Sequence, residues 1–358
     1  EFNKMKKLAV FLAFFAIFSI MSGIVHYDAM QVEAAGGYSE IVIEQSTGRV
    51  LYARDESSVK PMASTTKILT AITAIENYAG ELNETVTVPD CAVGVEGSSM
   101  YLQRGERLLF IDLLYGLMLR SGNDCAVAVA VLTAGSVENF AEMMNRTALK
   151  AGAVRSHFVN PHGLHDDNHY TTAADLAAIT AYAMKNDLFC EIVASRSYTT
   201  HRSRKDADKT IYNKNKLLTS YEGACGVKTG YTLKAGRCLV SAATRDGMTV
   251  IAVTLNCRPM FEECARLMDY AFENYRMTEL VPQGTIAYCA VNDKGETAGL
   301  RADGSCLYPV KKDGSEQAGY IISGVRPLHG QVESGSENGK LDIYLCKRLI
   351  FSAKLVTI

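Results

Sequence analysis

A serine and a lysine with SxxK spacing, Ser64 and Lys67 in MASTTK, could form a nucleophile and its base. Ser64 begins a run without Pro or Gly that lasts until Gly80, so we expect both side chains on one helix face, one turn apart. At a helix N-terminus the macrodipole favours negative charge developing on the serine and disfavours a charged lysine, so Lys67 could act as a neutral base. The alternative is that Ser64 only caps the helix and that Lys67 is solvated.

Motifs this short also occur by chance, and the chain contains a second SxxK and a second SxN. Ser57 and Lys60 form the second SxxK. Pro61 disfavours the α region for the residue before it, so this pair is not expected to share a helical turn. Ser336 and Asn338 form the second SxN, which lies in a polar, turn-rich stretch and predicts only a loop.

Two further motifs support the first one. RSGNDC places Ser121 and Asn123 at a break between two expected helices, and GVKTGYT places Lys228, Thr229 and Gly230 on an expected strand. In this order, SxxK, SxN and KTG form the signature of penicillin-recognising enzymes, in which a serine is acylated by a peptide or a β-lactam.

From about Tyr38 to its end, the chain resembles the serine-type D-Ala-D-Ala carboxypeptidases, the low-molecular-mass penicillin-binding proteins of the peptidase S11 family. The stretches that carry the resemblance are IVIEQSTGRVLYARDES, MASTTKILTA, LMLRSGNDCAVAVA, FVNPHGLHDDNHYTTAADLA and GVKTGYTLKAGRCLVSAATRDG. The resemblance implies an α+β fold in which a helical lobe packs on a five-stranded antiparallel sheet, with a small all-β domain after it. We expect no cofactor and no metal.

The resemblance also implies a role for each of four polar side chains. Ser64 would attack the carbonyl of the penultimate D-alanine, and Lys67 would accept its proton, although the acylation base is disputed in related enzymes. Ser121 would pass a proton to the departing D-alanine amine, and Asn123 would hydrogen-bond the peptide backbone of the substrate.

The KTG motif would bind the end of the substrate. Lys228 and Thr229 would hold the terminal carboxylate, with Gly230 beside them. The backbone N–H groups of Ser64 and Tyr231 would form the oxyanion hole, where the loss of one donor typically costs about 3 to 4 kcal/mol.

The implied function is removal of the terminal D-alanine from peptidoglycan stem peptides through an acyl-enzyme, with covalent inhibition by β-lactams. One alternative is a serine β-lactamase, which needs a glutamate to clear the acyl group; the corresponding stretch, AVRSHFVNPHGL, has none. Another is a non-catalytic penicillin-binding sensor or scaffold, against which the intact motifs argue. Transpeptidase and endopeptidase action stay open, since an amine can resolve the acyl-enzyme and the enzyme can attack a cross-link.

A histidine-rich stretch, HFVNPHGLHDDNHY, raises the question of a metal site. Its histidines are His157, His162, His165 and His169. A metallopeptidase would also need a base glutamate, and HExxH is absent. The Pro, Gly, Asp and Asn content predicts an irregular loop with a structural role or a place on the cleft rim.

Elements of two kinds must position these motifs. Residues 38–53 alternate around QSTG as a hairpin does, and GVKTGYT, GRCLVSAAT and MTVIAVTLN predict strands. Residues 65–79, the stretch 111–151 with breaks at glycines, TTAADLAAITAYAMKN with a capping box, and MFEECARLMDYAFENY predict helices. Strands before and after a helical block predict an α+β domain.

The domain plan begins with an export signal. Within residues 1–34, Lys6 and Lys7 precede an apolar run over 8–25 and a small-residue cleavage site, and 1–4 resemble a cloning remnant. Whether the signal is cleaved or anchors the chain stays open. Residues 35–277 are expected to form the carboxypeptidase domain and 278–358 a β-rich domain.

Localisation and partners follow from this plan. We expect an exported protein at the cell wall or the outer face of the cytoplasmic membrane, with peripheral membrane or wall association possible. Anchorage through the C-terminus is doubtful because KLVTI reads as a strand. The net charge of −2 gives no sign of a basic surface for nucleic acid.

The ten cysteines are scattered without a CxxC, so we expect mostly reduced thiols.

Overall fold

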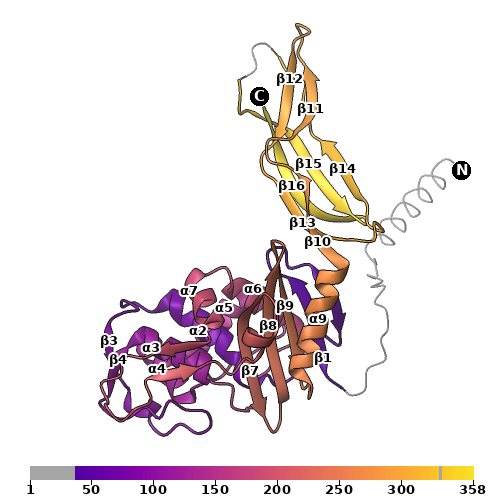
Figure 1. Ribbon diagram of the computed structural model, residues 1–358. Coiled ribbons are helices and arrows are strands. Elements are labelled where there is room, and N and C mark those ends of the chain that lie inside the picture. Colours follow the sequence, from indigo (N-terminus) through magenta and orange to yellow (C-terminus); the bar gives the residue numbers. More distant parts are fainter. Residues whose placement is uncertain (1–36, 330–332) are drawn as a thin grey trace, which may run out of the picture. The chain divides into compact units, whose positions relative to one another are not determined.

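The computed structural model describes residues 37–329 and 333–358 (Figure 1). The predicted signal peptide, residues 1–34, lies outside the described residues.

A five-stranded antiparallel sheet forms the centre of the first domain. Its strands, in the spatial order β2-β1-β9-β8-β7, are β1 (Ser39–Glu44), β2 (Val50–Arg54), β7 (Ala224–Thr232), β8 (Gly236–Arg245) and β9 (Met248–Leu255). The predicted hairpin 38–53 is β1 and β2. The chain returns to the sheet after the helical block as β7, which lies at the edge of the sheet and carries the KTG motif.

Both faces of this sheet are buried, each by different elements. On β1, Ile41 and Ile43 belong to the core shared with the helical lobe, whereas Val42 belongs to the core under α9 (Met260–Asn274). This alternation follows from the two-residue period of a strand. Figure 1 shows α9 on one face of the sheet and the other helices on the opposite face.

The helical lobe contains more breaks than the sequence pattern shows. Its segments are η1 (Ala63–Thr66), α2 (Lys67–Asn77), η2 (Asp90–Ala92), α3 (Phe110–Tyr115), the π-helical η3 (Gly116–Arg120), α4 (Asn123–Ala134), α5 (Val137–Lys150), α6 (Ala173–Ala183), α7 (Asp187–Ala194) and α8 (Leu217–Ser220). Two short strand pairs, β3 (Thr85–Thr87) with β4 (Arg107–Leu109) and β5 (Ser197–Thr199) with β6 (Thr210–Tyr212), were not predicted.

The expected capping box at the start of α6 is only half formed. The Asp175 N–H donates to the Thr172 hydroxyl over 3.0 Å. The Asp175 carboxylate accepts from the backbone N–H of Arg155 and the hydroxyl of Ser156, each at 2.7 Å, and so ties the preceding loop to the helix instead.

The C-terminal region is all β, as predicted. It contains the pair β10 (Tyr275–Val281) and β13 (Cys306–Lys311), and a sheet in the order β11-β12-β16-β15-β14 from β11 (Ile286–Val291), β12 (Thr297–Ala302), β14 (Ala318–Ser323), β15 (Glu337–Leu345) and β16 (Arg348–Thr357). A separate core includes Leu300, Ile343 and Leu355. Asn338 is not in a loop: it lies in β15, buried, and its side chain bonds the backbone of Arg326.

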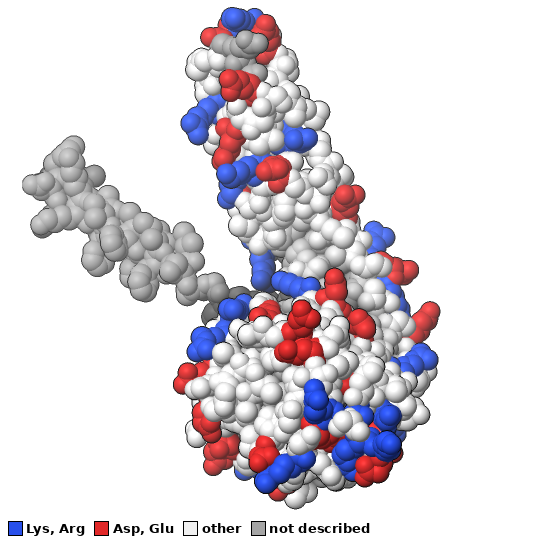
Figure 2. Space-filling model, turned by 90° about the vertical axis from the view of Figure 1, so that its left-hand side faces the viewer, with Lys and Arg blue, Asp and Glu red and all other residues white. Residues whose placement is uncertain are grey.

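The described surface and thiols show three general features. Lysines and arginines are interspersed with aspartates and glutamates on the face drawn in Figure 2. All ten cysteines are free. Within residues 37–329 and 333–358, no single helix has the length and apolar composition of a membrane span; α4 and α5 meet that test only as a pair bent by 86°.

Candidate active site

The tight turn η1 sets Ser64 next to the start of α2. The Thr65 hydroxyl donates to Met62 O at 2.7 Å, and the Thr66 hydroxyl donates to Ala63 O at 2.8 Å. These bonds close the turn from within, so Ser64 caps neither η1 nor α2. Lys67 is fully buried, and the alternative of a capping serine with a solvated lysine does not describe this structure.

The Lys67 amine has three polar neighbours. Its Nζ lies 3.0 Å from Ser64 Oγ, 2.7 Å from Asn123 Oδ1 and 2.7 Å from the His162 carbonyl oxygen. Burial, followed by the charge of Lys228, holds the pKa of Lys67 well below its ordinary value. A neutral amine has two N–H groups and one lone pair. Since the two carbonyl-type oxygens can only accept, they take the two N–H groups and leave the lone pair facing the serine hydroxyl.

Asn123, the first residue of α4, is fixed in one orientation. Its Nδ2 donates to the Glu96 carbonyl at 2.6 Å, so its Oδ1 is the atom that faces Lys67. Gly97 has φ +89°, and a Cβ there would stand 2.7 Å from Asn123 Nδ2. Only glycine therefore allows the loop to approach this amide.

Asp124 anchors the same loop, and the sequence reasoning missed it. Its buried carboxylate accepts from the Ser99 hydroxyl at 2.7 Å and from the backbone N–H groups of Met100 and Leu102 at 3.0 Å each. The available signal was an acidic residue in the first turn of a helix, directly after the SxN motif.

Ser121 lies at the break between η3 and α4, with φ +66°. A non-glycine residue in this left-handed region is uncommon and often marks a functional site. Ser121 lines the same cleft as Ser64.

Strand β7 forms the opposite wall of this cleft. A Cβ at Gly230 would be 3.0 Å from Met62 O and 3.1 Å from Ser64 N, so the strand approaches η1 as closely as it does because residue 230 has no side chain. One edge of β7 pairs with β8 and the other faces η1. Every second backbone group of an edge strand points away from its partner and is free for a ligand.

Two lysines lie along the KTG wall. Lys228 is buried, and its Nζ donates to the Thr229 carbonyl at 3.1 Å; burial and Lys214 lower the pKa of Lys228 to about 7. Lys214, which the sequence reasoning missed, lines the cleft and donates to Ser98 Oγ at 3.0 Å. No motif distinguishes Lys214 from other lysines.

The structure brings the predicted residues into one region. Those that line the cleft are Ser64, Ser121, Thr229, Gly230 and Tyr231. Behind this lining, Lys67 bonds Asn123 and lies close enough to Lys228 for that charge to lower its pKa. The chemical role of each residue stays a prediction.

The histidine-rich loop supports the serine turn. The Val159 N–H donates to His169 Nδ1 at 3.1 Å, so Nε2 carries the proton and faces the Thr66 hydroxyl at 2.8 Å. Burial lowers the pKa of His169 to about 3, which keeps the ring neutral. At Gly163 (φ +87°) a Cβ would stand 1.9 Å from Ala63 O, so only glycine lets the loop approach the serine turn this closely.

In the part of the chain that the structure describes, no group of three or more His, Cys, Asp or Glu could hold a metal ion.

Comparison with known families assigns the chain to a family. Residues 26–258 match the model of a family described as peptidase S11, D-alanyl-D-alanine carboxypeptidase. The chain belongs to this family. The predicted family and enzyme class, a serine-type D-Ala-D-Ala carboxypeptidase, are therefore confirmed.

Individual relatives agree with this assignment. The chain is 33% identical to a D-alanyl-D-alanine carboxypeptidase of Bacillus subtilis over 66% of its own length and 62% of that relative. It is 30% identical to one of Escherichia coli over 88% and 82%.

Solved structures extend the likeness to the fold. Penicillin-binding protein 5 of Haemophilus influenzae superposes with a TM-score of 0.77 at 25% identity, covering 92% of this chain and 98% of that one. A Streptomyces K15 DD-transpeptidase superposes with a TM-score of 0.62 at 34% identity, covering 69% and 99%. The predicted α+β fold with its β-rich C-terminal region is confirmed.

Proposed function

We propose that this S11 enzyme removes the terminal D-alanine from peptidoglycan stem peptides, with Ser64 as nucleophile and Lys67 as its base. The observation that carries the proposal is the surroundings of the Lys67 amine: it lies 3.0 Å from Ser64 Oγ, and two fixed acceptors occupy its N–H groups. A desolvated amine of this kind can take a proton at neutral pH.

The reaction would proceed in two stages. Ser64 Oγ bonds to the carbonyl carbon of the penultimate D-alanine while its proton moves to Lys67. The C–N bond then breaks, and the departing amine receives that proton through the Ser121 hydroxyl. Water hydrolyses the resulting ester, with Lys67 again available as the base. The N–H groups of Ser64 and Tyr231 would stabilise the oxyanion in both stages.

The substrate would lie against the free edge of β7. Lys228, with its positive charge, and Thr229 would bind the terminal carboxylate, which explains why a basic residue stands in an otherwise uncharged strand. Asn123, whose side chain is engaged by Lys67 and Glu96, would act on the substrate chiefly by orienting Lys67.

A β-lactam would acylate Ser64 in the same way but leave slowly. The stretch that corresponds to the glutamate-bearing stretch of a β-lactamase, residues 153–164, contains no glutamate; from it the His162 carbonyl contacts Lys67 at 2.7 Å, and a carbonyl oxygen cannot activate water as a base. This observation favours the carboxypeptidase over the β-lactamase.

Intact-mass spectrometry tests the proposal. The protein mixed with penicillin should gain one covalent adduct that persists for many minutes, and a peptide ending in D-Ala-D-Ala should lose one alanine. Ser64→Ala should abolish both. An adduct on the Ser64→Ala protein would overturn the assignment of the nucleophile, and rapid turnover of penicillin would indicate a β-lactamase.

The cellular setting is part of the proposal. Residues 35–277 would act as the catalytic domain and 278–358 as an accessory domain outside the cytoplasm, at the cell wall or the membrane surface. The family match over residues 26–258 supports a catalytic domain in the N-terminal two thirds of the chain. Fractionation of cells, with and without residues 1–34, would test export.

A further inference from the structure

The loop that fixes Asn123 is held in place by side chains and not by secondary structure. Residues 99–103 belong to no helix or strand, yet Met100 and Leu102 are buried. Buried backbone N–H and C=O groups need partners, so other groups must supply what a helix or a sheet would supply. Asp124 accepts from the N–H groups of Met100 and Leu102. The carbonyl groups of the loop need donors.

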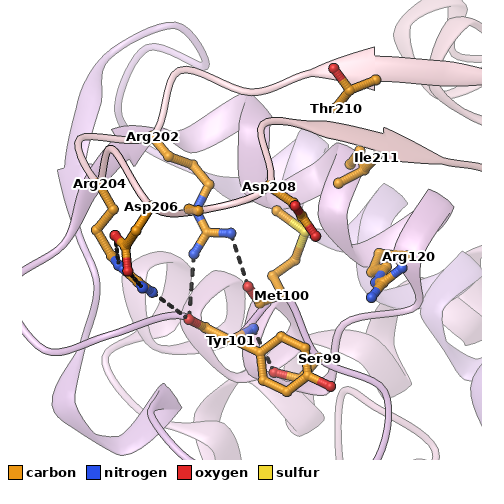
Figure 3. A pocket seen from close by; sticks show the side chains of 11 residues that line it. Ser99, Met100, Tyr101, Arg120, Arg202, Arg204, Asp206, Asp208, Thr210 and Ile211 are labelled. Atoms are coloured by element: carbon orange, nitrogen blue, oxygen red, sulfur yellow. Dashed lines mark hydrogen bonds and ion pairs between the residues drawn. The ribbon is translucent and has the colours of Figure 1, made fainter.

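Arg202, in the segment between β5 and β6, supplies these donors (Figure 3). Its Nη1 donates to the Met100 carbonyl at 2.9 Å, and its Nη2 donates to the Tyr101 carbonyl at 3.4 Å. The same guanidinium pairs with the Glu106 carboxylate, from Nε at 2.6 Å and from Nη2 at 3.1 Å. The side chains of Arg202 and Glu106 are 2% and 0% exposed. One buried guanidinium therefore fixes both the loop and the residue that follows it into β4.

The loop in turn fixes Asn123 at two points. The Asn123 backbone N–H donates to the Ser98 carbonyl at 2.7 Å, and its Nδ2 donates to the Glu96 carbonyl at 2.6 Å. With the amide held in this way, Oδ1 lies 2.7 Å from the Lys67 amine. A displaced loop would turn the amide and remove one of the two acceptors that leave the lysine lone pair facing Ser64.

Neither member of the buried ion pair touches the reacting groups. Among the described residues, those that line the catalytic cleft include neither Arg202 nor Glu106. A buried ion pair by itself contributes little to stability, because the cost of removing two charges from water offsets their attraction. The two bonds from Arg202 to backbone carbonyl groups give this pair a different task, which is to hold the loop.

We propose that Arg202 is a positioning residue for acylation. With Glu106 fixing its guanidinium, Arg202 holds the loop, the loop holds Asn123, and Asn123 holds Lys67 in the orientation that receives the Ser64 proton. This inference rests on the proposed function and names a residue outside the cleft on which that function depends.

Arg202→Lys removes the positioning and keeps a positive charge beside Glu106. An ammonium group lacks the planar fork that bonds the carboxylate and two carbonyl groups together. We expect the first-order rate of acylation by penicillin to fall about 10- to 100-fold, the effect of a misplacement of about 1 Å. The saturation constant for penicillin should change less than about twofold, since Arg202 does not line the cleft. Single-turnover kinetics at several penicillin concentrations separate the two quantities.

Arg49→Lys is the matched control. Arg49 also pairs with a largely buried glutamate, Glu316, and also donates to a backbone carbonyl, that of Pro309. It does not line the cleft. Its acylation rate should stay within about twofold of wild type even where it loses as much thermal stability as Arg202→Lys, because the two sites are independent.

A double-mutant cycle with Asn123→Ala tests the route of the effect. Without the amide, the loop has nothing to orient. Arg202→Lys should therefore slow acylation less than about twofold further in the Asn123→Ala protein, a strongly non-additive result. Intact-mass spectrometry over several hours can follow rates this low. Glu106→Gln, which weakens the same pair without changing its size, should depend on Asn123 in the same way and replaces Arg202→Lys if that variant does not fold.

Three results would overturn the positioning role. They are a wild-type acylation rate in the folded variant of the pair, an equal slowing with and without the Asn123 amide, and an equal slowing in Arg49→Lys at equal stability. If the wild type takes up no penicillin on Ser64, the proposed function itself fails, and this is known before any variant is compared.

Discussion

At the scale of single residues, the site depends on two lysines whose pKa is lowered by burial. Lys67 and Lys228 are both buried, and each has a lowered pKa. Their tasks are opposite, because a base must be neutral and a carboxylate binder must be charged. The motif pattern predicted both residues, but the groups that tune them are partly backbone atoms. The His162 carbonyl and the Glu96 carbonyl leave no mark in a sequence.

The pKa of Lys228, about 7, predicts an alkaline limit on substrate capture. Lys228 is charged below that pH and loses its proton above it, so kcat/KM for an acid-ended peptide should fall as pH rises through about 7. Steady-state kinetics across pH would measure this limit.

The variant Lys228→Arg identifies the group responsible. An arginine stays charged throughout the accessible range, so the limit should move to higher pH if the variant folds with a native circular-dichroism spectrum. A limit that stays in place in the folded variant would assign it to another group.

At the scale of elements, the site depends on how closely β7 approaches η1. The sequence predicted the strand and the helix, yet it could not predict their separation, which Gly230 sets. The sequence pattern also merged η1 and α2 into one helix, because hydroxyl-to-backbone bonds from Thr65 and Thr66 tighten the first turn in a way that hydrophobic periodicity does not record.

Gly230→Ala tests this spacing. The new methyl group would stand 3.0 Å from Met62 O, so η1 and β7 must move apart by a few tenths of an ångström. Because small displacements of reacting groups can cost up to about 10²-fold, we expect penicillin acylation to slow by about one to two orders of magnitude.

Gly319→Ala in β14 is the matched control, since a methyl group there meets nothing within 4 Å. It should acylate like the wild type. Acylation rates would be measured by stopped flow, and thermal stability by calorimetry. Slower acylation in Gly230→Ala alone, with equal thermal stability in both variants, would support the spacing argument. A wild-type acylation rate in Gly230→Ala would refute it.

At the scale of the whole molecule, the described chain has separate hydrophobic cores for the catalytic sheet and the C-terminal sheet. Sequence composition predicted the change from mixed to all-β structure near residue 278. It could not predict the contact between them. Arg49, in the β1–β2 turn, pairs with Glu316, and its guanidinium lies 5.2 Å from the ring centre of Tyr275 and 5.4 Å from that of Tyr308.

Arg49→Ala should loosen this contact without affecting chemistry. Removing one partner of a largely buried pair leaves Glu316 uncompensated, so we expect a loss of about 1 to 3 kcal/mol and a broader or split calorimetric transition. Penicillin acylation should stay within about twofold of wild type. A single, unshifted transition would show that the pair contributes little to stability.

The proposed mechanism requires Lys67 to be a neutral base, and the pH dependence of penicillin acylation in single turnovers tests this requirement most directly. A lowered pKa means that Lys67 loses its proton well below the ordinary lysine value of 10.5, so the acylation rate should rise with pH and reach its plateau well below that value. A rate that keeps rising with pH until about the ordinary lysine value would show that Lys67 stays charged at neutral pH, and would contradict the account.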